Sequence, residues 1–506
     1  MKMKKVILGG AVACALPLFA KIELGTPFSD GAVLQREKEV PVWGTADPGK
    51  DVTVEFAGTK ASVTAGADGM WMVKLPKMCA SKESRTMTVT ESEPGWFGSE
   101  TDRVEVRDVL VGEVWFASGQ SNMECPIWSD RTRYRDGKGG LMTTMTYLPY
   151  VRFAKNNKQW AVRPAKAKSQ GWKKFEPSSF TGYTLSAVAF YYARELYLAL
   201  DIPIGIVDAS RGGTNIDAWT PRCGYEGCDR SIQATADYPV KERWNEKTDC
   251  RGPINADLQQ PTVLFNGMVA SWAPMAMRGV IWYQGCHNGG EGHLYCAKLH
   301  ALYNGWSRAF ANPDLKFYVV QLAPFTHNWA GVCMAQAKFV SEQANAALSV
   351  TADVGNFHDV HPNDKEIVAK RLAVHALKRD YGFSIPEDDS PAVRSAQFGA
   401  DGVVTVDFDH VRNWYVYAPD WSRDAAFEVA GTNGVWTAAK IVNYRKGRDE
   451  SGKPADTDYI DGSMIAVRAA AVTAPVRVRY MGKNLTSGTL YNEASLPLGP
   501  FEATKR

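Results

Sequence analysis

The spacing of apolar residues changes twice along this chain of 506 residues. From about residue 22 to residue 106, short β-rich runs such as Val40-Pro-Val-Trp-Gly are separated by Asp-Pro-Gly and Ala-Asp-Gly turn signals, which is typical of a small β-sandwich. After Pro386 the same pattern returns, for example in Val403-Val-Thr-Val-Asp-Phe. The pattern therefore predicts a β-domain at each end of the chain, over residues 21–107 and 386–506.

Between these ends, strand-like apolar runs alternate with longer stretches of helical period. This alternation predicts an α/β domain with a doubly wound parallel sheet over residues 108–385, whose ligand crevice would lie beyond the carboxyl ends of the strands. The last helix should open with a capping box formed by Asn363 and Glu366 and end at Gly382. Strands are expected at 109–117, 202–208, 278–283, 316–322 and 349–354, and helices at 185–200, 261–272, 293–310, 334–348 and 364–381.

The first twenty residues have the pattern of a signal peptide. A basic start is followed by an apolar run from Val6 to Phe19 and by the small residue Ala20. We therefore expect a secreted or periplasmic protein without stable membrane insertion, since the run is too short to span a bilayer permanently. The formal net charge of +3 comes from these residues, and the remainder carries equal numbers of basic and acidic groups. A neutral chain gives no electrostatic reason to expect nucleic-acid binding.

Eight of the nine cysteines follow the signal segment. An even number in an oxidising compartment permits disulfides, and Cys223 with Cys228 is the most plausible local pair. These cysteines lie at the start of a polar stretch, residues 224–252, which we interpret as an excursion from the α/β domain.

Four segments with chemically useful residues each follow a predicted strand. Ser121, on the turn Gly119-Gln-Ser-Asn, could expose its hydroxyl as a nucleophile. Gly212 and Gly213 permit a close backbone approach and could supply an oxyanion N–H, although each of these segments alone is more often just a turn. The spacing does not fit a phosphate-binding loop.

The third and fourth segments supply an amide and an imidazole. Asn288 could donate its side-chain amide to an oxyanion, or it could simply cap a helix. His361 stands before a predicted helix and meets the requirement for a general base from another loop, with His358 as the competing base.

Together the four segments resemble the SGNH hydrolase superfamily and, within it, the sialate O-acetylesterase family. The resemblance lies in the order and spacing of four blocks: Gly119-Gln-Ser-Asn-Met, Gly212-Gly-Thr-x-Ile-x-Ala-Trp, Trp282-Tyr-Gln-Gly with Asn288, and Asp359-Val-His-Pro. It extends to the segments 28–36 and 490–501 and so covers nearly all of the chain after the signal segment.

The resemblance implies an SGNH-type catalytic domain flanked by β-sandwich-like domains, and an esterase that removes acetyl groups from sialic acids without a cofactor or metal. It implies Ser121 as nucleophile and His361 as general base. The oxyanion would be held by the N–H groups of Ser121 and of Gly212 or Gly213 and by the amide of Asn288. Gln120, Gln284 and Trp219, which lie in the shared blocks, are expected to contact the substrate.

The chain departs from the family pattern at two positions. Many relatives have an aspartate three residues before the histidine, where this chain has His358, so the group that orients His361 could be Asp359, another acid or a backbone carbonyl. Many relatives also have a glutamate at the position of Cys286. A metal site formed by Cys286, His287, His293 and Cys296 is not predicted, because their spacing fits no common zinc pattern.

Two other functions remain open from the sequence. The same catalytic groups would serve acetyl esters on other glycans, such as acetylated xylan. A non-catalytic carbohydrate-binding protein could instead use aromatic residues of the β-domains, unless these form the domain cores. The candidate aromatic residues are Trp96, Trp414, Trp421 and Trp436.

Overall fold

The structure is a computed structural model, and it describes most of the chain in ten segments. The predicted signal peptide, Trp96, Trp421 and most of the expected excursion at 224–252 lie outside these segments. No helix within them is long and apolar enough to cross a membrane. The described residues are 22–94, 99–127, 148–175, 185–236, 257–327, 329–355, 358–417, 426–447, 457–482 and 490–505.

The middle of the chain has a mixed α/β fold built on one large sheet. Six neighbouring strands of this sheet are parallel, and the seventh, β10 (Ser169–Phe175), pairs antiparallel with β9 at the edge. Every residue of β11 and β12 is buried, as expected for parallel strands covered on both faces. The parallel strands are, in spatial order, β9 (Leu148–Asn156), β11 (Ile204–Ser210), β8 (Glu100–Gly119), β12 (Gly279–Tyr283), β13 (Lys316–Val320) and β14 (Ala346–Ser349).

Strand β8 lies where the chain changes its direction of travel across the sheet. The next two parallel strands, β9 and β11, lie on one side of β8, and β12, β13 and β14 follow on the other. Gly119, the last residue of β8, is in register with Ser210 of β11 and with Tyr283 of β12. The loops after these three strands therefore leave the sheet at one level, at a topological switch point, where open α/β sheets bind their ligands.

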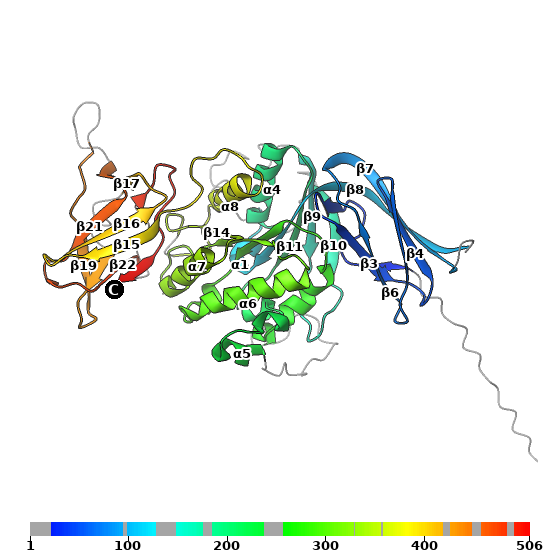
Figure 1. The fold of residues 1–506 in the computed structure, drawn as a ribbon, viewed down its shortest axis with the longest axis horizontal. Coiled ribbons are helices and arrows are strands. Elements are labelled where there is room, and N and C mark those ends of the chain that lie inside the picture. Colours follow the sequence, from blue (N-terminus) through cyan, green and yellow to red (C-terminus); the bar gives the residue numbers. More distant parts are fainter. Residues whose placement is uncertain are drawn as a thin grey trace, which may run out of the picture.

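Helices cover both faces of this sheet. In Figure 1, α4 (Ala187–Leu200) and α8 (Lys365–Arg379) lie on one side and α6 (Leu294–Ala309) and α7 (Ala330–Glu342) on the other, and each pair is in contact. The cap of α8 differs from the expected one, because Asp364 rather than Asn363 accepts a hydrogen bond from the N–H of Ile367, at 3.0 Å. The positive φ of Gly382 follows the end of this helix.

Five elements of the sheet region differ from the sequence prediction. Strand β10 was not predicted, and α7 spans Ala330–Glu342 instead of the expected 334–348. Residues 261–272 were expected to form an ordinary helix but form a π-helical turn, Phe265–Val269, followed by a 3-10 turn, Ala270–Trp272. Strand β14 begins and ends earlier than the expected 349–354. Strand β9 was not predicted because it carries a lysine and an arginine, yet Lys155 is buried in an ion pair with Asp208 of β11, with Nζ and Oδ2 2.7 Å apart.

The N-terminal region is built of β-strands and shares one of them with the central sheet. Strand β8 pairs antiparallel with β7 in its first part and parallel with β11 and β12 in its second, so the expected boundary at 107/108 falls inside a continuous strand. The other strands of this region are β1 (Glu23–Leu24), β2 (Val33–Gln35), β3 (Val40–Thr45), β4 (Asp51–Phe56), β5 (Thr59–Thr64), β6 (Met70–Leu75) and β7 (Ser81–Ser92).

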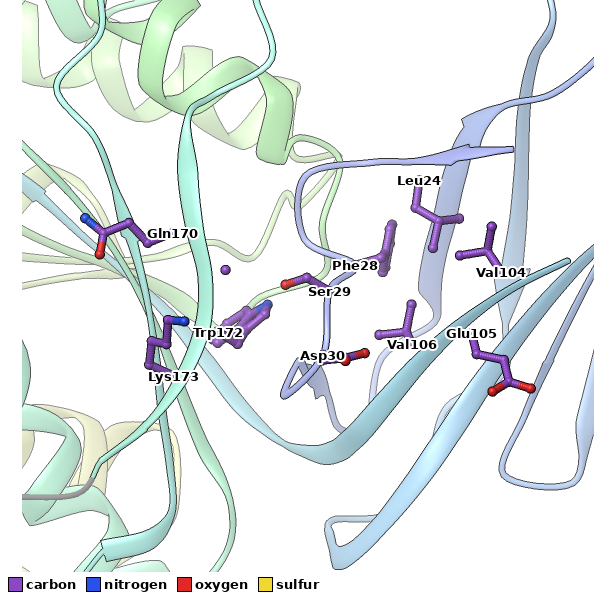
Figure 2. Close-up of a pocket in the computed structure, with 11 residues that line it drawn as sticks. Leu24, Phe28, Ser29, Asp30, Val104, Glu105, Val106, Gln170, Trp172 and Lys173 are labelled. Carbon is purple, nitrogen blue, oxygen red and sulfur yellow. The ribbon is translucent and has the colours of Figure 1, made fainter. Parts of the chain in front are cut away.

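A pocket marks the junction of this region with strand β10. Figure 2 shows Leu24 and Phe28 on one side of it and Trp172 of β10 on the other. The indole N–H of Trp172 donates to the carbonyl of Pro27, at 2.8 Å, and ties the two regions together. None of the predicted catalytic residues lines this pocket.

The C-terminal region consists of two antiparallel sheets that share one apolar core. Phe408 of the larger sheet and Trp414 of the smaller sheet meet edge to face, with ring centroids 4.9 Å apart. Val350 and Ala352, which follow β14, belong to the same core and join this region to the α/β region. The larger sheet contains β15 (Ala392–Phe398), β16 (Val403–Asp409), β18 (Phe427–Ala430), β19 (Trp436–Ile441), β21 (Met464–Arg468), β22 (Arg477–Tyr480) and β24 (Phe501–Thr504), and the smaller sheet contains β17 (Asn413–Tyr417), β20 (Thr457–Asp461) and β23 (Leu490–Tyr491).

Cys223 and Cys228 are free thiols, so the expected disulfide between them is wrong. The two thiols approach different acceptors. Cys223 lies 4.0 Å from the carbonyl oxygen of Gly305 on α6, whereas Cys228 lies 3.6 Å from that of Gly224.

Candidate active site

Ser121 follows the end of β8 on a turn that only glycine permits. Gly119 has a φ of +140°, and a Cβ added there would lie 2.2 Å from the carbonyl oxygen of Tyr283. The N–H of Gln120 donates to that same carbonyl, at 3.0 Å. The chain then forms the four-residue helix α1 (Ser121–Glu124), whose first residue, Ser121, is partly exposed. The turn thus presents the serine at the sheet edge.

The glycine loop after β11 lies directly against Ser121. The N–H of Arg211 donates to the carbonyl of Gly119, at 3.0 Å, and a Cβ on Gly212 would lie 3.3 Å from the Cβ of Ser121. The N–H of Gly212 donates to the carboxylate of Glu124, which also forms an ion pair with Lys158. A substrate oxyanion bound by Gly212 would therefore have to displace the Glu124 carboxylate.

Gly213 offers a second candidate N–H in the same loop. Its φ of +70° is left-handed, and a Cβ added there would meet nothing within 4 Å. The sequence left open which of the two glycines acts, and both lie in the loop that borders Ser121.

The side-chain oxygen of Asn288 is held by two hydrogen bonds, whereas its side-chain nitrogen donates none within the described part of the chain. Its side chain is 1% exposed, and its Oδ1 accepts hydrogen bonds from the N–H of Ile216, at 3.1 Å, and from Nε2 of Gln284, at 2.7 Å. Its Nδ2 is buried and has no hydrogen-bond partner among the described residues. A buried amide donor without a partner is costly unless a ligand satisfies it, so this group fits an oxyanion donor.

The three residues expected to contact the substrate are instead buried in the walls of the site. Oε1 of Gln120 accepts from the N–H of Gly285, at 3.1 Å, and Nε2 of Gln284 also donates to the carbonyl of Thr214, at 3.0 Å. The indole N–H of Trp219 donates to Oγ1 of Thr214, at 3.1 Å. This burial favours a role in holding the loops around Ser121 and Asn288 over direct contact with the substrate.

Asn122 and Lys365 connect the serine turn to the histidine loop. Nδ2 of Asn122 donates to the carbonyl of Val360, at 3.1 Å, and Oδ1 of Asn122 accepts from the buried ammonium of Lys365, at 2.6 Å. The residue before His361 is thus bonded to the residue after Ser121. Sequence reasoning missed both residues, although the position of Asn122 inside the Gly-Gln-Ser-Asn block was a usable signal.

His361 is held by the acid two residues before it. Oδ1 of Asp359 lies 3.2 Å from Nδ1 of His361 and accepts the backbone N–H of His361 at 2.9 Å. When Nδ1–H of His361 donates to the Asp359 carboxylate, Nε2 is the unprotonated nitrogen that can accept a proton from a hydroxyl. The competing base, His358, is exposed.

Cys286 does not replace the glutamate found in many relatives. Burial raises the pKa of its thiol to about 12, although the nearby charge of Lys365 opposes this effect. The side chain is therefore a neutral thiol at physiological pH and supplies no negative charge to the site.

A family model, curated relatives and a solved structure all relate this chain to carbohydrate acetylesterases. The sequence model of a carbohydrate esterase family, the sialic acid-specific acetylesterases, matches residues 111–377. The sialate O-acetylesterase of Mus musculus is 26% identical over 93% of this chain and 92% of its own length, and that of Homo sapiens is 28% identical over 69% of each. The crystal structure of a carbohydrate acetylesterase from Xanthomonas citri superimposes with a TM-score of 0.77 at 29% identity, over 96% of this chain and all of that one. The chain belongs to the carbohydrate esterase family of sialic acid-specific acetylesterases.

Proposed function

We propose that this protein is a serine esterase that hydrolyses O-acetyl esters on sialic acids through an acetyl-serine intermediate. The observation that carries the proposal is the buried, unpartnered amide of Asn288, in a loop at the same sheet edge as Ser121. Beside a serine hydroxyl, such a donor can stabilise the oxyanion that forms when the serine attacks an ester carbonyl. The family match and the sialate O-acetylesterase relatives support the reaction and the substrate class.

In the proposed mechanism, His361 removes the proton of Ser121 as its Oγ attacks the acetyl carbonyl. The N–H of Ser121, an N–H of Gly212 or Gly213 and the amide of Asn288 stabilise the oxyanion. The imidazolium, held by Asp359, protonates the departing sugar hydroxyl, and water then attacks the acetyl-enzyme by the reverse sequence of proton transfers.

We infer the SGNH arrangement for the α/β region and a division into three domains, whose first boundary, at 107/108, lies within the shared strand β8 and whose second lies at 385/386. The strand order around β8 and the placement of the four blocks at the ends of β8, β11, β12 and after β14 support it. The signal-like residues 1–20 support export to the periplasm or the exterior. An acetylated glycan is then the expected partner.

The tryptophans described in the C-terminal region give little support to the alternative of a non-catalytic glycan-binding protein. Trp414 is completely buried. Trp436 is covered by Arg477 and Arg479, whose guanidinium carbons lie 4.7 and 4.2 Å from its ring centroid. Trp414 therefore cannot stack on a sugar, and the two guanidinium groups already contact the ring of Trp436.

The decisive experiment combines a nucleophile variant with a substrate panel. Ser121→Ala should abolish acetate release from O-acetylated sialic acid and stoichiometric labelling by an organophosphonate, with the thermal midpoint unchanged because Ser121 is partly exposed. Full activity in this variant would exclude the mechanism. Faster release from acetylated xylan fragments than from O-acetylated sialic acid would retain the mechanism and replace the substrate.

A further inference from the structure

Helices α6 and α7 bring together three side chains that can bind a metal ion and that the proposed mechanism does not use. Cys296 and His300 lie one helical turn apart on α6, and Glu342 is the last residue of α7. Sγ of Cys296 lies 3.6 Å from Oε2 of Glu342, and Nε2 of His300 lies 3.0 Å from the same oxygen. The three ligand atoms all lie within 4.8 Å of one another.

These separations are close to those of a tetrahedral zinc site. Zinc binds thiolate sulfur at about 2.3 Å and imidazole nitrogen or carboxylate oxygen at about 2.0–2.2 Å, so neighbouring ligand atoms are roughly 3.3–3.5 Å apart. The two measured distances differ from this range by a few tenths of an ångström. The third separation, between Sγ of Cys296 and Nε2 of His300, is at most 4.8 Å, so side-chain rotations would have to bring these two atoms to the tetrahedral distance when an ion enters.

The surroundings leave the ligand atoms available. The His300 ring packs edge to face on Phe339 of α7, with centroids 4.9 Å apart, which fixes the imidazole plane. The side chains of His300 and Glu342 are 28% and 44% exposed, so a water molecule can reach a fourth position. Lys338 pairs with the other carboxylate oxygen of Glu342, Oε1, at 3.7 Å.

The described residues contain two other groups of converging ligand atoms, and both are less suitable. Asp388 and Asp389 hold the guanidinium of Arg379, and Asp388 also binds Lys378, so cations already occupy these carboxylates. The third group shares Asp389. The site that the spacing of the sequence argued against would have combined Cys296 with three other residues. These residues, Cys286, His287 and His293, belong to none of the three groups.

We propose that Cys296, His300 and Glu342 bind one Zn²⁺ ion, with water as the fourth ligand, as a structural tie between α6 and α7. The thiol of Cys296 loses its proton to solvent when the sulfur–zinc bond forms, as metal-bound thiols do. A cysteine, a histidine and a carboxylate together favour zinc over calcium or magnesium, which prefer oxygen ligands alone. Because α6 follows the loop that carries Asn288, the ion would stiffen the base of the candidate active site.

The test uses the full chain freed of metal and Co²⁺ as a spectroscopic substitute for zinc. We expect one equivalent of Co²⁺ to give the visible bands of tetrahedral coordination and a near-ultraviolet thiolate-to-cobalt band, and Zn²⁺ to remove both. Saturation with Zn²⁺ should raise the thermal midpoint by at least about 2 °C, since an ion that binds only the folded state stabilises it. These readouts do not depend on esterase activity.

Matched variants locate the site. His300→Ala, at a partly exposed position, and Cys296→Ser should each abolish the near-ultraviolet band, and Glu342→Gln should weaken Co²⁺ binding at least about tenfold. Cys228→Ser and His410→Ala change a free thiol and a histidine of another cluster, and both should titrate like the unchanged protein. The proposal is wrong if no thiolate band forms, or if the band persists in folded His300→Ala.

Discussion

The two ends of the Asn288 amide have different roles. Its oxygen is held by Ile216 and Gln284, whereas its nitrogen is buried and unpaired. A side chain fixed in this way does not have to reorient when negative charge develops beside it, which is the property expected of an oxyanion donor.

Replacement of Asn288 should therefore lower turnover more than substrate binding. We expect Asn288→Ala to reduce kcat by about 10²–10³-fold with little change in KM, because the lost hydrogen bond forms only in the transition state. Steady-state acetate release measures both constants. Asn288→Asp is the matched control for folding, since it keeps an acceptor for Ile216 and Gln284. This variant should be equally inactive, and wild-type turnover in it would contradict the role of the amide.

The group that orients His361 can be tested at Asp359. Asp359→Asn removes the negative charge beside Nδ1, and we expect kcat/KM to fall by about 10²-fold, less than the roughly 10⁴-fold seen for a buried triad aspartate. The smaller loss follows from the exposure of the Asp359 side chain, 32%, which lets water replace part of its effect. His358→Ala should leave the rate unchanged, and the opposite ranking of these two variants would make His358 the relevant neighbour.

Individual contacts were the part of the site that sequence could not predict. The motifs place Ser121, Asn288 and His361 on loops that follow strands or precede a helix, and the structure has them there. The bond from Asn122 to Val360 and the contact of Glu124 with Gly212 join segments far apart in the chain, so no local pattern encodes them. The burial of Trp219 likewise depends on partners from other elements.

Helix α8 begins at Lys365, shortly after His361, so its first turn affects the loop that holds this histidine. Asp364→Ala removes the bond to the N–H of Ile367, and we expect a loss of about 1 kcal/mol in the free energy of unfolding. Denaturant titration measures this loss. Asp364→Asn retains a capping oxygen and should lose at most a few tenths of that. Equal stability of the alanine variant and the wild type would show that the cap contributes nothing.

The periodicity of apolar residues predicted the regular strands and helices but missed a strand with buried charge and a π-helical turn. Strands β11, β12 and β13 and helices α4, α6 and α8 lie close to their expected positions. Strand β8 ends near its expected end but begins at Glu100 instead of residue 109. Strand β9 was missed because a buried lysine looks like a surface residue until its partner, Asp208, is known. The π-helical turn at 265–269 was missed because its apolar residues have a helical spacing.

A buried carboxylate joins the N-terminal region to the central sheet. Glu113 of β8 accepts hydrogen bonds from Arg278, before β12, with Nη2 and Oε1 2.8 Å apart, and from Gln35 of β2, at 3.1 Å. Arg36, after β2, adds a second ion pair at 2.5 Å. Burial alone would raise the pKa of Glu113, but the bonds from Arg278 and Arg36 outweigh it and hold the pKa below its ordinary value.

Because the pKa of Glu113 is lowered in the folded state, this carboxylate should make the free energy of unfolding fall in acid. A carboxylate with a lowered pKa stabilises the folded state above its unfolded pKa, about 4.5, and this stabilisation is lost as the pH falls through the lower folded value. Glu113→Gln should cost about 3 kcal/mol at neutral pH, because two arginines lose their buried partner. It should also flatten the fall in stability below pH 4.5, as measured by urea unfolding at several pH values. An unchanged slope would locate the acid sensitivity elsewhere.

The length of β8 has a consequence for how the protein can be divided. The match to the family begins at residue 111, yet the backbone that ends beside Ser121 begins as a strand at Glu100, inside the N-terminal region. The two terminal β-regions therefore differ in how they are joined to the central sheet: within the described residues, only the N-terminal one shares a strand with it. The C-terminal one shares its core with Val350 and Ala352, which follow β14, whereas removal of the N-terminal one would cut strand β8, which leads directly to the proposed nucleophile, Ser121.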